Sequence, residues 1–298
     1  MDCQRIGGSD PRQFWSDFWR EATRIATHLL VLITIVIACL AALARSAAAA
    51  DAPASQAAAV LEKARQYKLQ YRTGDATVIA PWVAMLEEAT RVEPDNADLW
   101  YAMGYVYLAQ GAQALQAQNP AGAMSAMQKG PAALRQALKL NPEHAPALSQ
   151  LGGIQTLLGP VLKLPAMAPR GVAQMNRAVE LAPESIPVRL MRAFAGPNLP
   201  AELRNTAHEA EDLDYLIQVS EWGTAGDYMR ILRGDLHFEG GQLEQARAMY
   251  RAVESSGSGA SADARKRLAA LESGGVPMEE IRFLRSAAGA QCAMCHAR

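Results

Sequence analysis

The chain lacks cysteine throughout its body, since all four cysteines lie near its two ends: Cys3, Cys39, Cys292 and Cys295. A disulfide framework therefore cannot hold the main fold together. Aromatic residues make up only 6% of the chain, and β-branched residues are also sparse. Ala, Leu, Met, Glu, Gln and Arg dominate instead, which favours helices. We expect an all-α protein.

The chain also lacks a strong charge of either sign. Its formal net charge is −1 across 298 residues, which gives no electrostatic basis for binding nucleic acid. Its body shows no nucleophile–base pair, phosphate-binding loop or cluster of metal ligands. We therefore expect a non-enzymatic protein that does not bind nucleic acid.

Residues 1–50 have the pattern of an export signal. Several arginines precede the uncharged run Leu29–Ala44, and the small residues Ala47–Ala50 form a cleavage-like site before Asp51. Basic residues ahead of an apolar run place the N-terminus in the cytoplasm and the remainder outside. The sequence predicts an exported, periplasmic protein.

The fate of this leader has three alternatives. It is cleaved as a signal peptide, or residues 25–44 are retained as a membrane anchor, since about 20 apolar residues span a bilayer. In the third alternative Cys39 is lipidated, because Val36–Cys39 resembles a lipobox. Each alternative puts the residues beyond about 50 outside the cytoplasm.

One phrase occurs three times in the body, at Ala89–Pro94, Ala137–Pro142 and Ala178–Pro183. Each copy has an alanine, an apolar residue and then a proline that cannot continue a helix. Ten residues after each proline a small residue lies in the next helical stretch: Gly104, Gly152 and Ala193. This period predicts stacked helix pairs.

These residues resemble the tetratricopeptide repeat. The first unit matches its consensus at Trp100, Met103, Gly104 and Tyr107, and the last unit at Leu232, Gly234, Gly241, Ala246 and Tyr250. The resemblance covers roughly residues 75–255 and implies an irregular helical-repeat domain, 51–253, that binds a peptide or a partner protein.

Three irregularities interrupt the repeat. Roughly 14 extra residues follow the Trp100 helix and about seven follow Gly152, while Glu202–Val219 is expected to be one helix within a poorly matching stretch. Gly159–Pro169 is expected to be a proline-rich loop that contacts a partner or packs onto its own repeat.

The composition changes after the repeats, where residues 254–276 are expected to be a linker with a short helix at 263–272. Pro277 then starts a last helix, 277–298, that contains Cys292-Ala-Met-Cys295-His296. Cys-x-x-Cys-His is the haem-attachment motif of c-type cytochromes. The two thiols bond to the two vinyl groups of one haem, and His296 is the expected ligand of its iron.

The end of the chain also resembles the cytochrome c′ group, whose motif lies late in a C-terminal helix and is soon followed by arginine, here Arg298. Only two residues follow His296, so we expect a sixth iron ligand to come from a partner or from the repeats, or the sixth position to be open. Candidates in the repeats are methionines or one of His144, His208 and His237. A zinc site and a thiol-redox pair are the alternatives for the motif.

Two functions of different class follow from these patterns. In the first, an exported c-type cytochrome uses its repeats to dock one covalent haem c on a redox partner. In the second, the chain is a non-redox scaffold for protein binding or cytochrome c maturation, without bound haem.

Overall fold

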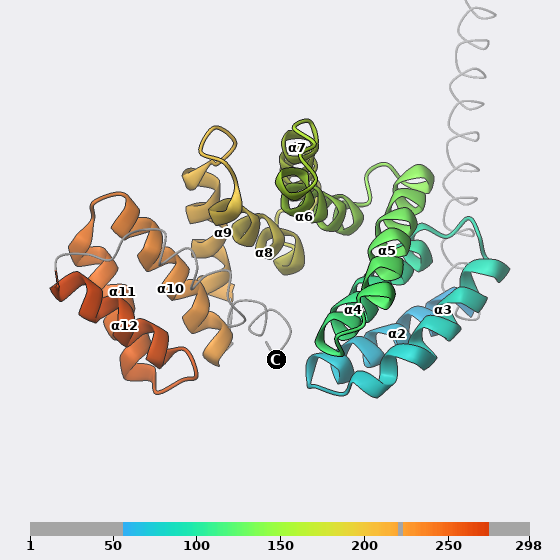
Figure 1. Cartoon of the computed structure of the whole chain (residues 1–298), viewed down its shortest axis with the longest axis horizontal. Coiled ribbons are helices and arrows are strands. Elements are labelled where there is room, and N and C mark those ends of the chain that lie inside the picture. Colours follow the sequence, from blue (N-terminus) through green and yellow to red (C-terminus); the bar gives the residue numbers. More distant parts are fainter. Residues whose placement is uncertain (1–55, 220–222, 274–298) are drawn as a thin grey trace, which may run out of the picture. The chain divides into compact units, whose positions relative to one another are not determined.

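The computed structural model of the chain describes residues 56–219 and 223–273. The predicted leader, 1–50, and the predicted haem-attachment helix, 277–298, lie outside these residues. Within the described ranges every regular element is helical (Figure 1). No helix of these ranges is both long and apolar enough to cross a membrane.

The described α-helices are α2 Gln56–Arg72, α3 Ile79–Val92, α4 Ala97–Gln116, α5 Pro120–Leu140, α6 Ala145–Val161, α7 Met167–Leu181, α8 Ile186–Ala195, α9 Thr206–Val219, α10 Gly223–Glu239, α11 Leu243–Ser256 and α12 Ser261–Glu272. Short 3₁₀ turns lie at Ala76–Val78 and Gly196–Asn198. Consecutive helices pack as pairs from α2–α3 to α10–α11, and α12 packs on α11. The predicted all-α class and helical-repeat array are confirmed.

The three copies of the repeated phrase form the same helix end. The alanine carbonyl accepts the backbone N–H four residues later, as in Asn141 N–H to Ala137 O at 2.8 Å. The backbone N–H three residues further along then donates to the carbonyl of the residue at which the helix ended, as His144 N–H does to Asn141 O. Ala137 and Ala178 are 0% exposed. Each phrase therefore ends a second helix and starts the next pair, as predicted.

Small residues let the two helices of a pair approach closely. A Cβ on Gly104 of α4 would lie 2.7 Å from Leu134 Cδ2 of α5, and one on Gly152 would lie 2.6 Å from the Gly171 carbonyl. Such distances are shorter than real carbon contacts, so a larger residue would push the helices apart. The positions at which the repeat predicts small residues are therefore the positions at which the paired helices pack.

The extra residues of the irregular units mainly lengthen helices. Helices α4 and α5 contain 20 and 21 residues and are joined through Asn119, whose side chain caps α5. Two expected boundaries are wrong. Helix α9 starts at Thr206 and not at Glu202, because Asn205 Oδ1 accepts the N–H groups of Ala207 and His208 as an N-cap.

The predicted loop Gly159–Pro169 is the second wrong boundary, since only residues 162–166 lie between α6 and α7. Helix α6 ends with Leu164 N–H bonded to Gly159 O and Lys163 N–H bonded to Pro160 O, the bonding pattern of a Schellman motif. Lys163 takes the left-handed conformation, with φ of 55°. Side chains of both Leu162 and Leu164 are exposed.

The segment expected to be a linker is tightly packed where it is described. Helix α11 continues to Ser256, and after a short turn α12 buries Ala260, Ala264 and Arg267 against α10 and α11. The buried carboxylate of Asp235 accepts hydrogen bonds from Arg267 and from Tyr250 OH. Helix α12 therefore closes the core of the last pair.

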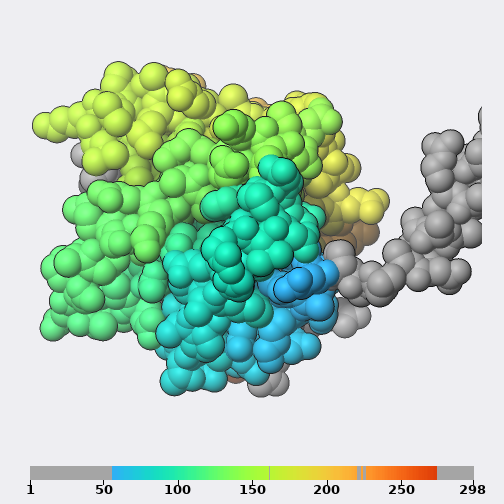
Figure 2. All heavy atoms as spheres, turned by 90° about the vertical axis from the view of Figure 1, so that its right-hand side faces the viewer, coloured from blue at the N-terminus to red at the C-terminus, as the bar shows by residue number. Residues whose placement is uncertain are grey.

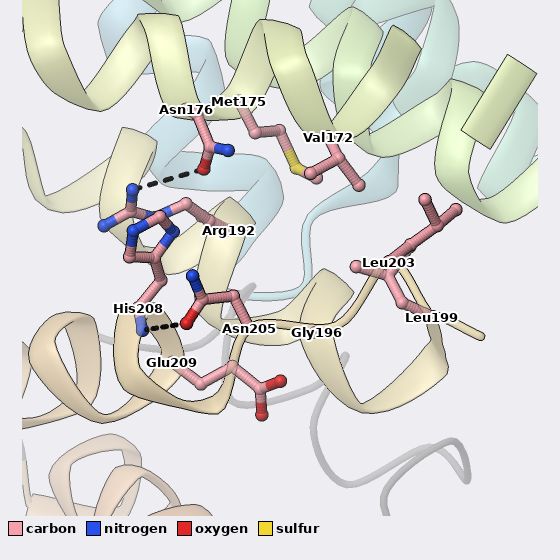
Figure 3. A pocket seen from close by; sticks show the side chains of 10 residues that line it. All are labelled: Val172, Met175, Asn176, Arg192, Gly196, Leu199, Leu203, Asn205, His208 and Glu209. Carbon is pink, nitrogen blue, oxygen red and sulfur yellow. Dashed lines mark hydrogen bonds between the residues drawn. The ribbon is translucent and has the colours of Figure 1, made fainter. Parts of the chain in front are cut away.

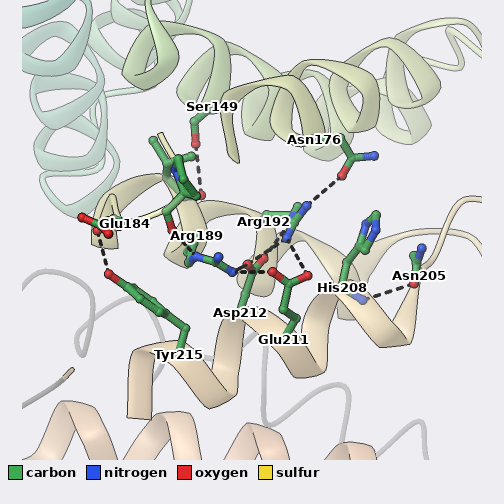
Figure 4. Close-up of polar contacts among 12 residues, drawn as sticks. Ser149, Asn176, Glu184, Arg189, Arg192, Asn205, His208, Glu211, Asp212 and Tyr215 are labelled. Atoms are coloured by element: carbon green, nitrogen blue, oxygen red, sulfur yellow. Dashed lines mark hydrogen bonds and ion pairs between the residues drawn. The ribbon is translucent and has the colours of Figure 1, made fainter. Parts of the chain in front are cut away.

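A second buried ion cluster joins α8 to α9 (Figure 4). Asp212 of α9 is 0% exposed, and its carboxylate accepts hydrogen bonds from Arg189 and Arg192 of α8 at 2.6–2.8 Å. Arg192 also donates to Asn176 of α7. Helices α8 and α9 are thus joined by buried charge pairs in addition to their apolar contacts.

Candidate functional site

The predicted haem ligands Cys292, Cys295 and His296 lie outside the described residues. The repeats contain no group of three His, Cys, Asp or Glu residues able to hold a metal, as far as the described ranges extend. The functional features that the structure does describe are the three candidate histidines, one small pocket and one larger groove.

Two of the three histidines have structural partners. His144 is buried at the start of α6, where Nδ1 accepts Ala147 N–H at 3.1 Å and Nε2 lies 3.0 Å from Asp98 Oδ1. His237 Nδ1 lies 2.6 Å from the side-chain oxygen of Gln242. Both nitrogens of His144 are therefore occupied, which removes it as a ready ligand for iron or zinc.

His208 lies beside a small pocket formed by α7, α8 and α9 (Figure 3). Met175, Asn176 and Arg192 line the same pocket, and Glu209 is ion-paired to Arg204 at its edge. The pocket encloses about 20 Å³, which is room for about one water molecule. Among the described residues, His208 is the candidate histidine whose ring makes no hydrogen bond.

A larger groove of about 260 Å³ lies between α5 and α6, with the start of α7 at one end. Figure 2 shows the green side chains of α4 and α5 beside the yellow-green ones of α6 and α7. The apolar lining residues are Met127, Pro131, Leu151, Ile154, Leu158 and Met167. The polar lining residues are Gln128, Arg135 and Gln155.

Exposed apolar side chains gather around this groove. They lie on α5, on α6 and in the 162–166 turn, and they are 41–63% exposed: Met124, Met127, Leu157, Leu162 and Leu164. They make up half of the ten large apolar residues that are exposed in the described ranges. Single exposed apolar residues need no explanation, but a cluster beside a groove marks an interaction surface.

One buried hydrogen-bond acceptor of the groove is unpaired in the described residues. Gln155 is 9% exposed, and its buried Oε1 has no hydrogen-bond partner. Pro131 lies inside α5 and, because proline has no N–H, cannot donate to the carbonyl of Met127 one turn earlier, but Met127 itself is exposed. A buried acceptor without a donor costs about 1–3 kcal/mol. A ligand that brings N–H donors would remove this cost.

The described helices are similar to a solved tetratricopeptide-repeat structure. It is the crystal structure of a thermophilic protein of this kind from Thermus thermophilus. The similarity covers 68% of this chain and 96% of that one, at 14% sequence identity and a TM-score of 0.45. No protein-family model matches the chain. A comparison with curated proteins also gave no match.

The sequence directed attention to the 159–169 segment but missed the groove beside it. That segment contributes Met167 to the lining and Leu162 and Leu164 to the surroundings. The α5 wall and Gln155 carry no motif. The sequence does contain one signal for this region, because acidic residues are almost absent between Leu99 and Val179.

Proposed function

We propose that the chain is an exported, non-enzymatic c-type cytochrome whose helical repeats bind a partner protein and whose C-terminal motif carries one covalent haem for electron transfer. The observation that carries this proposal is the spacing Cys292-x-x-Cys295-His296. The leader supports it, because haem attachment to such motifs takes place on the outer side of the membrane. The groove supports the protein-binding part.

The donor set fits the cofactor. Cys292 and Cys295 would hold the haem through thioether bonds, in which the thiol hydrogen is added to the vinyl group and no other reactant is needed. His296 would bind the iron. Bound haem supplies one-electron redox chemistry. The repeats position this group by holding the partner.

The mass of the mature protein tests the haem. Protein produced together with the cytochrome maturation system is expected to show the mass of the polypeptide plus one haem, and to keep haem staining on a denaturing gel. Cys292→Ala and Cys295→Ala should lose or weaken the stain, and His296→Ala should alter the absorption spectrum. Met294→Ala is the matched control, since it keeps the two thiols and the histidine.

The second candidate function is a non-redox periplasmic scaffold that binds a protein segment, as in cytochrome c maturation. The groove favours it, because its mostly apolar lining and the unpaired Gln155 oxygen do not depend on a cofactor. A polypeptide mass without haem, obtained with the maturation system present, would exclude the cytochrome and leave this scaffold function.

A further inference from the structure

Charge is unevenly distributed along the chain, and the groove lies in its basic part. Between Leu99 and Val179 there is one acidic residue, Glu143, against six basic residues. The net charge of this stretch is +5, although the whole chain has −1. Helices α5 and α6, which form the two walls, contain no acidic residue.

Most of these basic side chains have no counter-ion. Arg177 is paired with Glu143 and Glu180, and Lys129 lies over the ring of Tyr107. Within the described residues the other four form no ion pair: Arg135, Lys139, Lys163 and Arg170. Arg135 lines the groove itself, and Arg170 is three residues from Met167 of the lining. In the part of the chain that the structure describes, the groove thus has one arginine without an ion pair in its lining, and a second follows its lining residue Met167 closely in sequence.

The size of the groove favours a side chain over a small-molecule ligand. Its volume of about 260 Å³ is below the range of roughly 300–1,000 Å³ that is typical of small-molecule sites. Its wall is mostly apolar, and the unpaired Gln155 oxygen suits a backbone N–H group of a peptide. These features fit one large apolar side chain inserted from a peptide.

The chain's own terminal segments do not complement this charge. Residues 274–298 contain two glutamates and three arginines, and residues 1–55 contain five acidic and five basic residues. Neither segment brings net negative charge to a stretch whose net charge is +5. Charge complementarity therefore points to a different protein.

We infer that the groove between α5 and α6 binds a short acidic segment of a partner protein. The segment inserts a large apolar side chain among Met127, Ile154 and Leu158, places carboxylates near Arg135, and donates N–H groups to the Gln155 amide oxygen. This inference rests on the protein-binding part of the proposed function and does not depend on the haem.

Selection from random peptides tests the inference without assuming a ligand sequence. Twelve-residue peptides displayed on phage are selected on the purified full chain. The expected result is enrichment of peptides in which Asp or Glu flank a large apolar residue. The leading peptide is then synthesised with a fluorescent label, and its binding is measured by anisotropy.

Variants of the groove locate the binding. Arg135→Glu should weaken the leading peptide at least tenfold, and Met127→Ala should weaken it several-fold. Arg251→Glu is the matched control, because Arg251 is an exposed arginine of α11 that forms no ion pair in the described residues. When the acidic residues of the leading peptide are changed to Lys, the changed peptide should bind the Arg135→Glu protein more tightly than it binds the unsubstituted protein.

Three results would overturn the inference. One is enrichment of no peptides or of peptides without acidic bias, and another is an equal response of the Arg135→Glu and Arg251→Glu proteins. The third is competition from the chain itself: tighter peptide binding after deletion of 277–298, or a dimer in light scattering that Arg135→Glu dissociates. Haem staining tests the cytochrome proposal separately, so a failure of the groove inference can be distinguished from a failure of the cytochrome proposal.

Discussion

Gly234 is the residue at which one added side chain tests the packing of the last helix pair. A Cβ there would lie 2.6 Å from Tyr250 Cε1, so Gly234→Leu must displace the Tyr250 ring. We expect a loss of about 1–3 kcal/mol in the free energy of unfolding, measured by thermal or urea denaturation.

Gly240→Leu is the matched control for Gly234→Leu. Gly240 is exposed, and the atoms nearest to its would-be Cβ are at 3.5 Å or more, so this variant should unfold close to the parent. Equal stability of both variants would show that α10 and α11 are not in the register described.

The raised pKa values of two tyrosines of α4 predict how the stability of the fold changes at alkaline pH. Burial raises the pKa of Tyr101 to about 12, and burial together with a hydrogen bond to Glu87 raises that of Tyr107 to about 12. In the unfolded chain both ionise near pH 10. Between pH 10 and 12 the unfolded state therefore binds fewer protons, and stability falls as pH rises.

The urea midpoint measured from pH 9 to pH 11.5 checks this prediction. Tyr101→Phe removes one of the two ionising groups, so its midpoint should decline less steeply than that of the parent. An identical slope in the two proteins would count against burial of Tyr101.

At the scale of elements, the contact between α8 and α9 depends on one buried carboxylate. Asp212→Ala leaves the buried guanidinium groups of Arg189 and Arg192 without their shared acceptor. We expect a loss of about 3–5 kcal/mol, measured by urea denaturation at neutral pH.

Glu211→Ala is the neighbouring control for this prediction. Glu211 pairs with the same arginines, but its side chain is 57% exposed, so its loss should cost less than about 1 kcal/mol. Similar effects of the two substitutions would mean that the ion cluster is open to water.

The sequence predicted the helix ends at Pro94, Pro142 and Pro183, because the proline restriction acts locally. It misplaced the start of α9, because the apolar period continues back to Glu202 while the N-cap at Asn205 decides the boundary. The groove was missed for a different reason, since it depends on how α5 packs on α6, which leaves no trace in local periodicity.

At the scale of the whole molecule, reporter fusions test the topology that the leader predicts. Alkaline phosphatase fused after residue 55, where α2 has not begun, should be active in a Gram-negative host, since this enzyme needs oxidising conditions. Fusion after residue 24, ahead of the apolar run, is the control and should be inactive. Activity only from the second fusion would reverse the predicted topology and remove support for the haem.

The net charge of −1 conceals an uneven distribution of charge along the chain. It gives no electrostatic reason to expect nucleic-acid binding, but it averages a stretch of +5 and a remainder of −6. The difference became meaningful once the structure placed Arg135 in a groove. The Cys-x-x-Cys-His motif and the helical repeat could be recognised in the sequence. The groove between α5 and α6, which we propose as the partner-binding surface, could not.

The uneven charge has a consequence for the speed of association. Opposite charges on two proteins attract them before contact and raise the rate of productive encounters, while the lifetime of the complex depends on its short-range contacts. An acidic partner should therefore arrive more slowly as ionic strength rises, and leave at a nearly constant rate. Frequent encounters of this kind would suit the proposed electron carrier, which has to meet its partners in turn.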